Sequence, residues 1–422
     1  MKKSLVAVAV LGALATTAHA DDALTVYGVV DAAVRYNTNA NYNATTGTSS
    51  GYVGLSQGLF NGSRFGLKGA EDLGNGLKAI YTLEGGVILG TGASDQQGQL
   101  FGRQSWAGLQ DETLGTLTLG RQYGNLSGAI GTGDVFGELH GNEVYVSGAN
   151  EGDVASENGF AYGLTGYRWD NSILYANKLG PVKFSAMHAY AGQNATTPTT
   201  SGQATTMNSV AVGYVSDSFN ATVGYQKETD AGPNAVAATN LPNHTDIGVG
   251  ANYLYGDKTE FGGRNGVFAY YLSSKYDAGF YRINGTNSQF NFTQTAAGAL
   301  YSARQDKVIS LSTNYYATSK LNLIAAYFRD KATNVLDPVA QAAEVANAGG
   351  TDGSRNGFIV TADYYFSKNT DSYLMGAHTS FKGALIGNPN GGNATNAPAN
   401  AANAGVGPAS VNTVMIGMRH RF

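Results

Sequence analysis

The side chains of this chain that could do chemistry are charged residues at alternate positions of extended segments, together with a run of acids between two such segments. In the stretch Ser63–Glu84, the cationic Arg64 and Lys68 alternate with apolar residues, which places charge on one face and hydrocarbon on the other. The connection Tyr123–Gly159 contains no Lys or Arg but holds several acids: Asp134, Glu138, Glu143, Glu151, Asp153 and Glu157. Residues of these types at these spacings support electrostatic rather than covalent chemistry.

Covalent and metal-dependent chemistry lacks the residues that it needs. The chain contains no Cys, so disulfides and thiolate metal sites are excluded. Its six His are scattered, and neither the zinc-protease pattern H-E-x-x-H nor the phosphate-binding pattern G-x-x-x-x-G-K-[ST] occurs. We therefore expect no catalytic residue, no cofactor and no metal site. The formal net charge of −4 is too small to indicate a nucleic-acid partner.

The elements that position these charges are segments in which apolar and polar residues alternate with a period of two, as in a β-strand with two different faces. Within Ser63–Glu84, two such runs flank Glu71–Asn75, whose Asp, Gly and Asn residues favour a hairpin turn. Sixteen alternating segments occur along the chain: Leu24–Tyr36, Ser63–Glu71, Leu77–Gly85, Gln99–Gln110, Thr116–Gln122, Gly166–Asn177, Val182–Tyr190, Asn208–Ser216, Phe219–Glu228, Thr245–Tyr255, Gly266–Tyr276, Asp306–Tyr316, Leu321–Lys331, Arg355–Phe366, Asp371–Phe381 and Val411–Phe422. Most contain 9–12 residues, and a tilted strand needs about 9–11 residues to cross the hydrocarbon layer of a membrane.

The connections between these segments alternate in length along most of the chain. Tight turns are expected at 72–76, 111–115, 178–181, 217–218, 317–320 and 367–370, and long connections at 37–62, 191–207, 277–305, 332–354 and 382–410. A soluble β-sandwich has no reason to gather its long loops at one end, whereas this arrangement with an even number of strands is typical of outer-membrane barrels. The sequence therefore predicts an all-β fold, a 16-stranded antiparallel transmembrane β-barrel.

The first twenty residues differ from the rest of the chain. Lys2–Lys3 is a positive pair, Leu5–Ala15 is apolar, and Ala18–Ala20 has the A-x-A form of a cleavage site. This layout predicts a secretory signal peptide at residues 1–20, followed by one barrel domain at 21–422.

Alternation also predicts which charges face the interior of the barrel. Arg35 lies inward on the first segment, Arg64 and Lys68 on the second, Arg103 on the fourth and Arg168 on the sixth. A charged side chain that faced lipid at the membrane midplane would cost about 2–4 kcal/mol. We therefore expect a basic inner wall, and some of its charges are expected to form structural ion pairs.

Five stretches, taken together, carry a resemblance to a known family. They are Leu24–Asp31, Ser63–Glu84, Phe101–Leu109, Leu117–Gln122 and Gly417–Phe422. The chain resembles the general diffusion porins of Gram-negative outer membranes, most closely the trimeric porins of β-proteobacteria. The resemblance implies a water-filled channel for passive diffusion of ions and small hydrophilic solutes, a homotrimer, and contact with outer-membrane lipid and lipopolysaccharide.

The resemblance also gives the acidic connection a role. In such porins the third long loop folds into the barrel and narrows it, and its acids face arginines across the lumen. Asp134 and Glu138 then stand at the tip of an inward-folded third loop, although the sequence there departs from the commoner Pro-x-Phe-Gly-Gly form. The predicted pore-lining set, whose first three members match basic positions of the family, is Arg64, Lys68, Arg103, Arg35, Arg168, Asp134 and Glu138.

Two alternatives remain open for a barrel of this kind. A solute-specific porin for sugars would resemble an eighteen-stranded barrel with aromatic residues along its lumen. Many aromatic residues of this chain, such as Tyr36 and Phe65, instead fall on the outward face or near strand ends, where they fit interfacial girdles. An outer-membrane enzyme would need a nucleophile and a base near the rim. The sequence leaves the ion preference open, because the acidic net charge and the basic inner wall point in opposite directions.

Overall fold

The structure is a computed structural model that describes residues 24–43, 48–58, 60–136, 168–190, 205–230, 243–277, 279–280, 300–301, 304–335, 350–386 and 409–422. The predicted signal peptide at residues 1–20 and the predicted pore residue Glu138 lie outside these ranges.

The described residues form antiparallel strands and two short helices. The strands are β1 (Thr25–Asn43), β2 (Thr48–Gln57), β3 (Arg64–Gly74), β4 (Leu77–Ile88), β5 (Ala93–Ser94), β6 (Gln104–Asp111), β7 (Gly115–Tyr123), β8 (Arg168–Leu179), β9 (Val182–Ala189), β10 (Thr205–Val215), β11 (Phe219–Asp230), β12 (His244–Tyr255), β13 (Asn265–Tyr276), β14 (Gly279–Phe280), β15 (Leu300–Tyr301), β16 (Gln305–Tyr316), β17 (Leu321–Thr333), β18 (Gly353–Tyr365), β19 (Thr370–Gly383) and β20 (Ser410–Arg421). The helices are α2 (Asp95–Gly98) and α3 (Asn125–Thr132). Neither helix of this described part has the length and apolar character needed to span a membrane.

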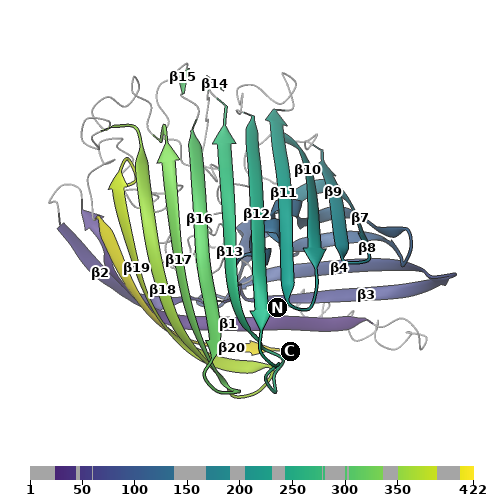
Figure 1. Cartoon of the computed structure of the whole chain (residues 1–422), viewed down its shortest axis with the longest axis horizontal. Helices are drawn as coiled ribbons and strands as arrows, with labels where there is room; N and C mark the ends of the chain where they lie inside the picture. The colour runs from purple at the N-terminus through teal and green to yellow at the C-terminus, as the bar shows by residue number, and fades with distance from the viewer. Residues whose placement is uncertain are drawn as a thin grey trace, which may run out of the picture.

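The main sheet closes on itself as a barrel (Figure 1). Successive strands pair antiparallel, and β20 returns to pair with β1, with Ile416 opposite Val34. β2 and β3 both pair with β1, at its two ends, and so act as one interrupted strand. The two-residue strand β5 and the separate β14–β15 pair do not contribute to the wall. With this count, the described residues form the predicted closed barrel of 16 antiparallel strands.

The two faces of the barrel wall differ in polarity, as the alternation predicts. On β17, Leu323 and Tyr327 are exposed on the outer face, whereas Asn322 and Asp330 are buried on the inner face. An outer face covered with exposed apolar side chains is unfavourable in water and is stable against lipid. Aromatic residues gather on the outer face beside the short turns, where a girdle is expected: Tyr214, Phe219, Tyr253, Tyr255, Tyr315, Tyr364 and Phe366.

The predicted β3–β4 hairpin shows how local sequence sets the register of the barrel. Asp72 accepts a hydrogen bond from the Gly74 amide at 2.8 Å, and Asn75 and Gly76 have φ angles of 55° and 83°. Asn and Gly adopt this left-handed backbone at little cost, whereas other residues do not. The resulting register places Glu84 on the same inner face as the cations of β3.

The region after β1 differs from the long connection predicted at 37–62. β1 continues to Asn43, and β2 runs back beside it with Leu55 opposite Val34. The prediction failed there because this Asn-, Thr- and Ser-rich sequence has little apolar alternation, while pairing with β1 still satisfies its backbone hydrogen bonds. The interruption between Gln57 and Arg64 is the remaining irregular part. β6 likewise begins later than predicted, at Gln104, because residues 99–103 form an irregular connection between α2 and the strand.

Candidate functional site

Three of the predicted pore-lining cations lie around one carboxylate of the inner wall. Glu84 of β4 is 4% exposed, and its Oε1 lies 3.0 Å from the Nε of Arg103, which is 2% exposed. The guanidinium groups of Arg103 and Arg168 each donate a hydrogen bond of 3.2 Å to the hydroxyl of Tyr123. Arg64 stands on the same face, two residues from the position opposite Glu84. We call Arg64, Arg103 and Arg168 the basic cluster.

Arg103 reaches the inner face for a reason that strand alternation does not supply. The inward residues of β6 are Gln104 and Trp106, because they pair opposite Glu84 and Thr82 of β4. Arg103 lies just before β6, where its amide donates to the Glu84 carbonyl at 3.0 Å. At that break its side chain turns to the Glu84 carboxylate, so a buried ion pair fixes its direction.

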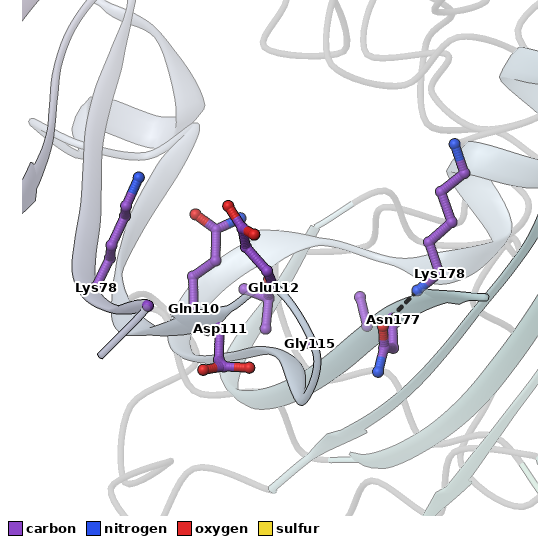
Figure 2. A pocket seen from close by; sticks show the side chains of 10 residues that line it. Lys78, Gln110, Asp111, Glu112, Gly115, Asn177 and Lys178 are labelled. Atoms are coloured by element: carbon purple, nitrogen blue, oxygen red, sulfur yellow. Dashed lines mark hydrogen bonds between the residues drawn. The ribbon is translucent and has the colours of Figure 1, made fainter. Parts of the chain in front are cut away.

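Lysines extend the positive charge from the basic cluster toward the short-turn end of the barrel. The Nζ of Lys68 lies 5.2 Å from the centroid of the Tyr27 ring. Lys178 and Lys183 are direct neighbours across the β8–β9 pair. Figure 2 shows Lys78 and Lys178 on opposite sides of a pocket beside the turns of β6–β7 and β8–β9. Lys178 and Lys183 repel each other and attract anions, whereas Asp111 and Glu112 lie between Lys78 and Lys178 in the pocket of Figure 2.

Arg35 is the predicted pore-lining cation that lies away from the basic cluster. It is buried on the inner face of β1, between Gly54 of β2 and Met415 of β20. It lies six positions along β1 from Val29, the partner of Arg64, which is about 20 Å along an extended strand. Arg35 therefore lines the wall at a different height.

The described part of the acidic connection lies against the opposite inner wall. α3 buries Leu126 and Ile130 against the inner face of β10–β13. A glycine makes this close approach possible, because a Cβ at Gly250 would collide with the carbonyl oxygen of Ala129. Asn252 donates a hydrogen bond of 2.8 Å to a carbonyl at the end of α3. The start of the connection is thus held against the inner face of the barrel.

Asp134 lies two residues after the end of α3 and is 4% exposed. Its Oδ1 accepts a hydrogen bond of 3.2 Å from the Phe136 amide. The neighbouring Gly133 contacts Ala269 of β13 and Gly250 of β12. Asp134 therefore follows a residue that contacts the wall formed by β12 and β13, whereas the basic cluster lies on β3–β8.

Arginines on the far wall of the barrel are paired with acids. Arg304 lies 2.7 Å from Asp306, and Arg355 lies 3.2 Å from Asp330, with all four side chains buried. The inward-facing acids on β11–β19 are Glu228, Asp246, Asp306, Asp330, Asp363 and Asp371. The two sides of the inner wall therefore differ in charge, one basic and the other acidic with its arginines neutralised.

One histidine of the inner wall has neighbours like those of a hydrolase. The Nε2 of His244 lies 2.7 Å from the hydroxyl of Ser274 and 2.8 Å from the Asp246 carboxylate, and its Nδ1 lies 3.4 Å from Glu228. A general base needs a free lone pair toward the serine, but Asp246 draws a proton to that same nitrogen. The three central groups are also buried. We interpret the cluster as a structural ion-pair network.

A serine pattern that occurs in hydrolases is also placed wrongly for catalysis. The sequence G-x-S-x-G appears around Ser49 and Ser56, and both lie within β2. The hydrolase nucleophile sits at a sharp turn between a strand and a helix. β2 is instead followed by the interruption and β3.

A closed antiparallel barrel with an apolar outer face and a charged inner wall is a transmembrane β-barrel, because closure satisfies every strand edge within lipid. The chain belongs to the Gram-negative porin family, which it matches over residues 7–384. Membership of this family places the barrel in the outer membrane.

Individual relatives are similar over part of the chain. An outer membrane porin protein of Bordetella pertussis is 39% identical over 183 residues, which are 42% of this chain and 44% of that protein. Outer membrane porin protein 32 of Delftia acidovorans is 37% identical over 136 residues, 32% of this chain and 36% of that protein. The chain thus spans less than half the length of these curated relatives.

Among solved structures, the fold is similar to that of the anion-selective porin from Comamonas acidovorans. The TM-score is 0.64 at 20% identity, and the match covers 95% of this chain and all of that one. At this identity the likeness concerns the fold.

Proposed function

We propose that the chain forms a water-filled channel through which ions and small hydrophilic solutes diffuse passively across the outer membrane. The observation that carries the proposal is the charge difference between the basic cluster and the wall that holds α3 and Asp134. A sixteen-stranded barrel encloses an aqueous lumen rather than a packed core. Opposite charges on its two sides create a transverse field that sorts small solutes without binding them tightly.

The constriction of this channel lies between the basic cluster and the acidic connection. Arg64, Arg103 and Arg168 form one side, and Asp134 begins the other; Glu138 continues it on the family's pattern. Lys68 extends the positively charged side toward the short turns. Arg35 contributes to the wall at another height and has a smaller effect on the constriction.

We further propose that the channel prefers anions. The basic cluster and the lysines that follow it place most of the inward cations along β3–β9, with carboxylates such as Glu84, Asp111 and Glu112 among them. The arginines of the far wall lie against Asp306 and Asp330. An anion is therefore attracted by the cations of one side, and the acids of the far wall repel it little because ion-pair partners balance them.

Planar-bilayer recordings of the purified chain test together whether it forms a channel and whether that channel prefers anions or cations. We expect ohmic channels whose reversal potential in a salt gradient has the sign of anion preference. Arg64→Ala should shift that potential toward cations, and Asp134→Asn should shift it further toward anions. A chain without conductance would refute the channel. Unchanged conductance and reversal potential in both variants would remove these residues from the constriction.

A channel rather than an enzyme also follows from the family and from the arrangement of its polar groups. The His244 network is closed to substrate, and Ser49 and Ser56 lie within a strand. Among the described residues, no group of three or more potential ligands is arranged to hold a metal ion. Hydrolysis of ester or peptide substrates by the purified chain would contradict this proposal.

Lipopolysaccharide is the lipid partner that we propose for the outer face. Among the described residues, six cations face outward at the long-loop end of the barrel, and we call them the outer basic belt: Lys227, Lys275, Lys307, Arg329, Lys331 and Lys382. Lys307 and Lys331 are directly opposite each other. Two outward lysines so placed are stable at the membrane interface when phosphate groups of the lipid lie between them.

The outer basic belt predicts a lipid contact that becomes weaker at high salt and when the lysine charges are removed. Lys307→Ala/Lys331→Ala should retain less lipopolysaccharide through purification than the parent chain, with unchanged conductance. Equal retention of lipopolysaccharide and of its dephosphorylated form would contradict a phosphate contact.

A homotrimer is the assembly that we propose. Small residues lie on the outer face of β1, β3 and β4, namely Gly28, Ala32, Gly69 and Ala79, while the outer basic belt lies on β11–β19. Ala32 and Ala79 allow close approach of a second barrel, whereas the rings of Phe422 and Tyr81 cover Gly28 and Gly69. The belt then faces lipid on the free side. Chemical cross-linking in mild detergent should give a trimer.

A further inference from the structure

The interruption between β2 and β3 is a bulge that enters the barrel. Gln57 lies opposite Ala32, and Arg64 lies opposite Val29, so that seven steps along this strand (64 − 57) oppose three steps along β1 (32 − 29). A regular ladder would need three, and the extra residues must leave the wall. We call Gly58 together with Phe60–Ser63 the inner bulge.

Asp31 of β1 fixes the backbone of the inner bulge. One carboxylate oxygen accepts hydrogen bonds from the amides of Phe60 and Asn61 at 3.1 and 2.9 Å, and the other accepts one from the Tyr373 hydroxyl at 2.8 Å. A Cβ at Gly58 would collide with this carboxylate. Asp31 is fully buried, and this set of donors compensates the burial of its charge.

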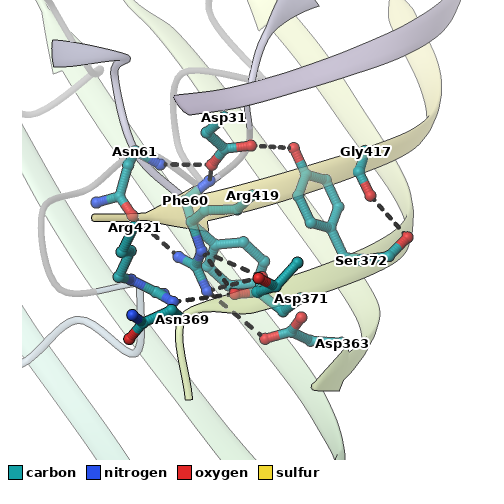
Figure 3. A network of polar contacts seen from close by, with 12 residues as sticks. Asp31, Phe60, Asn61, Asp363, Asn369, Asp371, Ser372, Gly417, Arg419 and Arg421 are labelled. Carbon is teal, nitrogen blue, oxygen red and sulfur yellow. Dashed lines mark hydrogen bonds and ion pairs between the residues drawn. The ribbon is translucent and has the colours of Figure 1, made fainter. Parts of the chain in front are cut away.

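Phe60 projects from the bulge into a cage of side chains (Figure 3). The Arg419 guanidinium lies 4.3 Å from the centroid of the ring, and Tyr373 meets the ring edge to face at 5.1 Å. Arg419 is itself held by Asp371, through contacts of 3.0 and 3.1 Å, and donates to Asn61 at 3.0 Å. Charged hydrogen bonds and a cation–π contact thus hold Phe60 in one position.

Phe60 also contacts the acidic connection. Its ring centroid lies 5.8 Å from that of Phe136, and both rings are buried in the same apolar cluster. Gly133 still contacts β13, so within three residues the connection passes from β13 to the bulge beside β1 and β20. The connection is therefore held at two places, by α3 on β10–β13 and by Phe136 on Phe60.

We infer that Phe60 is a positioning residue for the constriction: it anchors Phe136, and with it Asp134, so that the acidic side of the lumen keeps a fixed distance from the basic cluster. Asp31 and Arg419 act through Phe60 by holding the bulge. This inference rests on the proposed channel function. Loss of the anchor leaves the barrel wall intact but lets the connection move, which widens and destabilises the current path.

Single-channel recordings of Phe60→Ala, Phe136→Ala and the double variant test the anchor. Each single substitution should raise conductance and open-channel noise and admit larger neutral polymers into the lumen. The double variant should do no more than either single one, because both remove the same contact. Phe358→Ala is the matched control, since Phe358 faces outward on β18 and is 50% exposed; its conductance and noise should equal those of the parent chain. Parental conductance and noise in both single variants, or effects that add, would overturn the anchor.

A cross-link tests the contact even where no current is measured. The chain has no Cys, so Phe60→Cys/Phe136→Cys can be cross-linked without a background. The reagent is a short bifunctional maleimide, because the two rings meet through their tips and a disulfide needs Cβ atoms within about 4.5 Å. We expect the cross-link in this pair, and none in Phe358→Cys/Phe136→Cys. Absence of the first cross-link in the folded barrel would refute the contact between Phe60 and Phe136. A cross-link in a protein without conductance would refute the proposed channel function but not the contact. If Phe60→Ala does not fold, Phe60→Leu should still give noise above that of the parent chain, because it keeps part of the apolar contact and loses the ring that Arg419 covers; parental noise in that variant would overturn the anchor.

Discussion

The two sides of the inner wall use the same residue types in different ways. On β3–β8, the arginines of the basic cluster gather around one carboxylate, Glu84, and one hydroxyl, that of Tyr123. On β16–β18, Arg304 and Arg355 each lie against a buried acid. Alternation along a strand therefore decides only that a charge points inward. The number of acids within reach decides whether that charge acts on a solute or stabilises the wall.

Removing Arg355 should separate these two roles most strongly. Arg355→Ala leaves Asp330 buried without its partner, for which we expect a loss of about 3–5 kcal/mol in the free energy of unfolding. Urea unfolding in lipid vesicles measures this loss. The reversal potential should stay at the parental value, because a neutralised pair contributes little to the field in the lumen. A shift in reversal potential as large as that of Arg64→Ala would erase the distinction between the walls.

Gly250 tests whether the far wall is a support for α3. Gly250→Ala inserts a Cβ where the Ala129 carbonyl lies, and overpacking of this kind costs about 1–3 kcal/mol. We expect a lower unfolding midpoint and noisier current, since α3 must move from β12. Gly376→Ala is the control, because the space there is open except for a distant Val360 methyl group. Equal behaviour of the two variants would show that α3 does not depend on this approach.

Arg168 should give the smallest effect on stability together with a clear effect on selectivity. Its described contacts include the Tyr123 hydroxyl at 3.2 Å and the Tyr123 ring at 4.8 Å, and a cation–π contact of this kind is worth about 0.5–2 kcal/mol. Arg168→Ala should shift the reversal potential toward cations. Lys307→Ala removes the same charge from the outer face and should leave the potential unchanged. Similar shifts in both would mean that overall charge, not the basic cluster, sets the preference.

Local patterns predicted the parts of this molecule that local physics determines. The β3–β4 hairpin was predictable because turn residues and alternation agree over Ser63–Glu84, and the same alternation gave sixteen strands. The inner bulge was not predictable, because Asp31, Tyr373 and Arg419 come together only when the barrel closes. Their place in the sequence carries no sign of that contact.

Inner-wall polarity was predicted on one side and not on the other. A lumen of water favours polar inward residues, as on β3 and β4. On β13, β16 and β18, however, Leu272, Val308 and Ile359 face inward and are buried in one apolar cluster with Phe136 and residues of α3. The strand sequences alone could not show this, because the apolar partner comes from a connection on the other side of the barrel. Tyr123 was missed for a related reason, since its role depends on Arg103, from the break before β6, and Arg168, from β8.

The pairing of β1 with β20 has a consequence for how the molecule is made. Gly28 and Phe422 exchange backbone hydrogen bonds of 3.0 and 3.1 Å at this seam, although they lie at opposite ends of the described chain. Contacts between such remote residues form late, after most of the loop entropy has been lost. Until then the growing sheet presents two open margins to lipid, where unpaired amides are costly. Insertion should therefore need an assembly factor that pairs with those open strand edges. A nascent chain halted before β20 should stay bound to that factor.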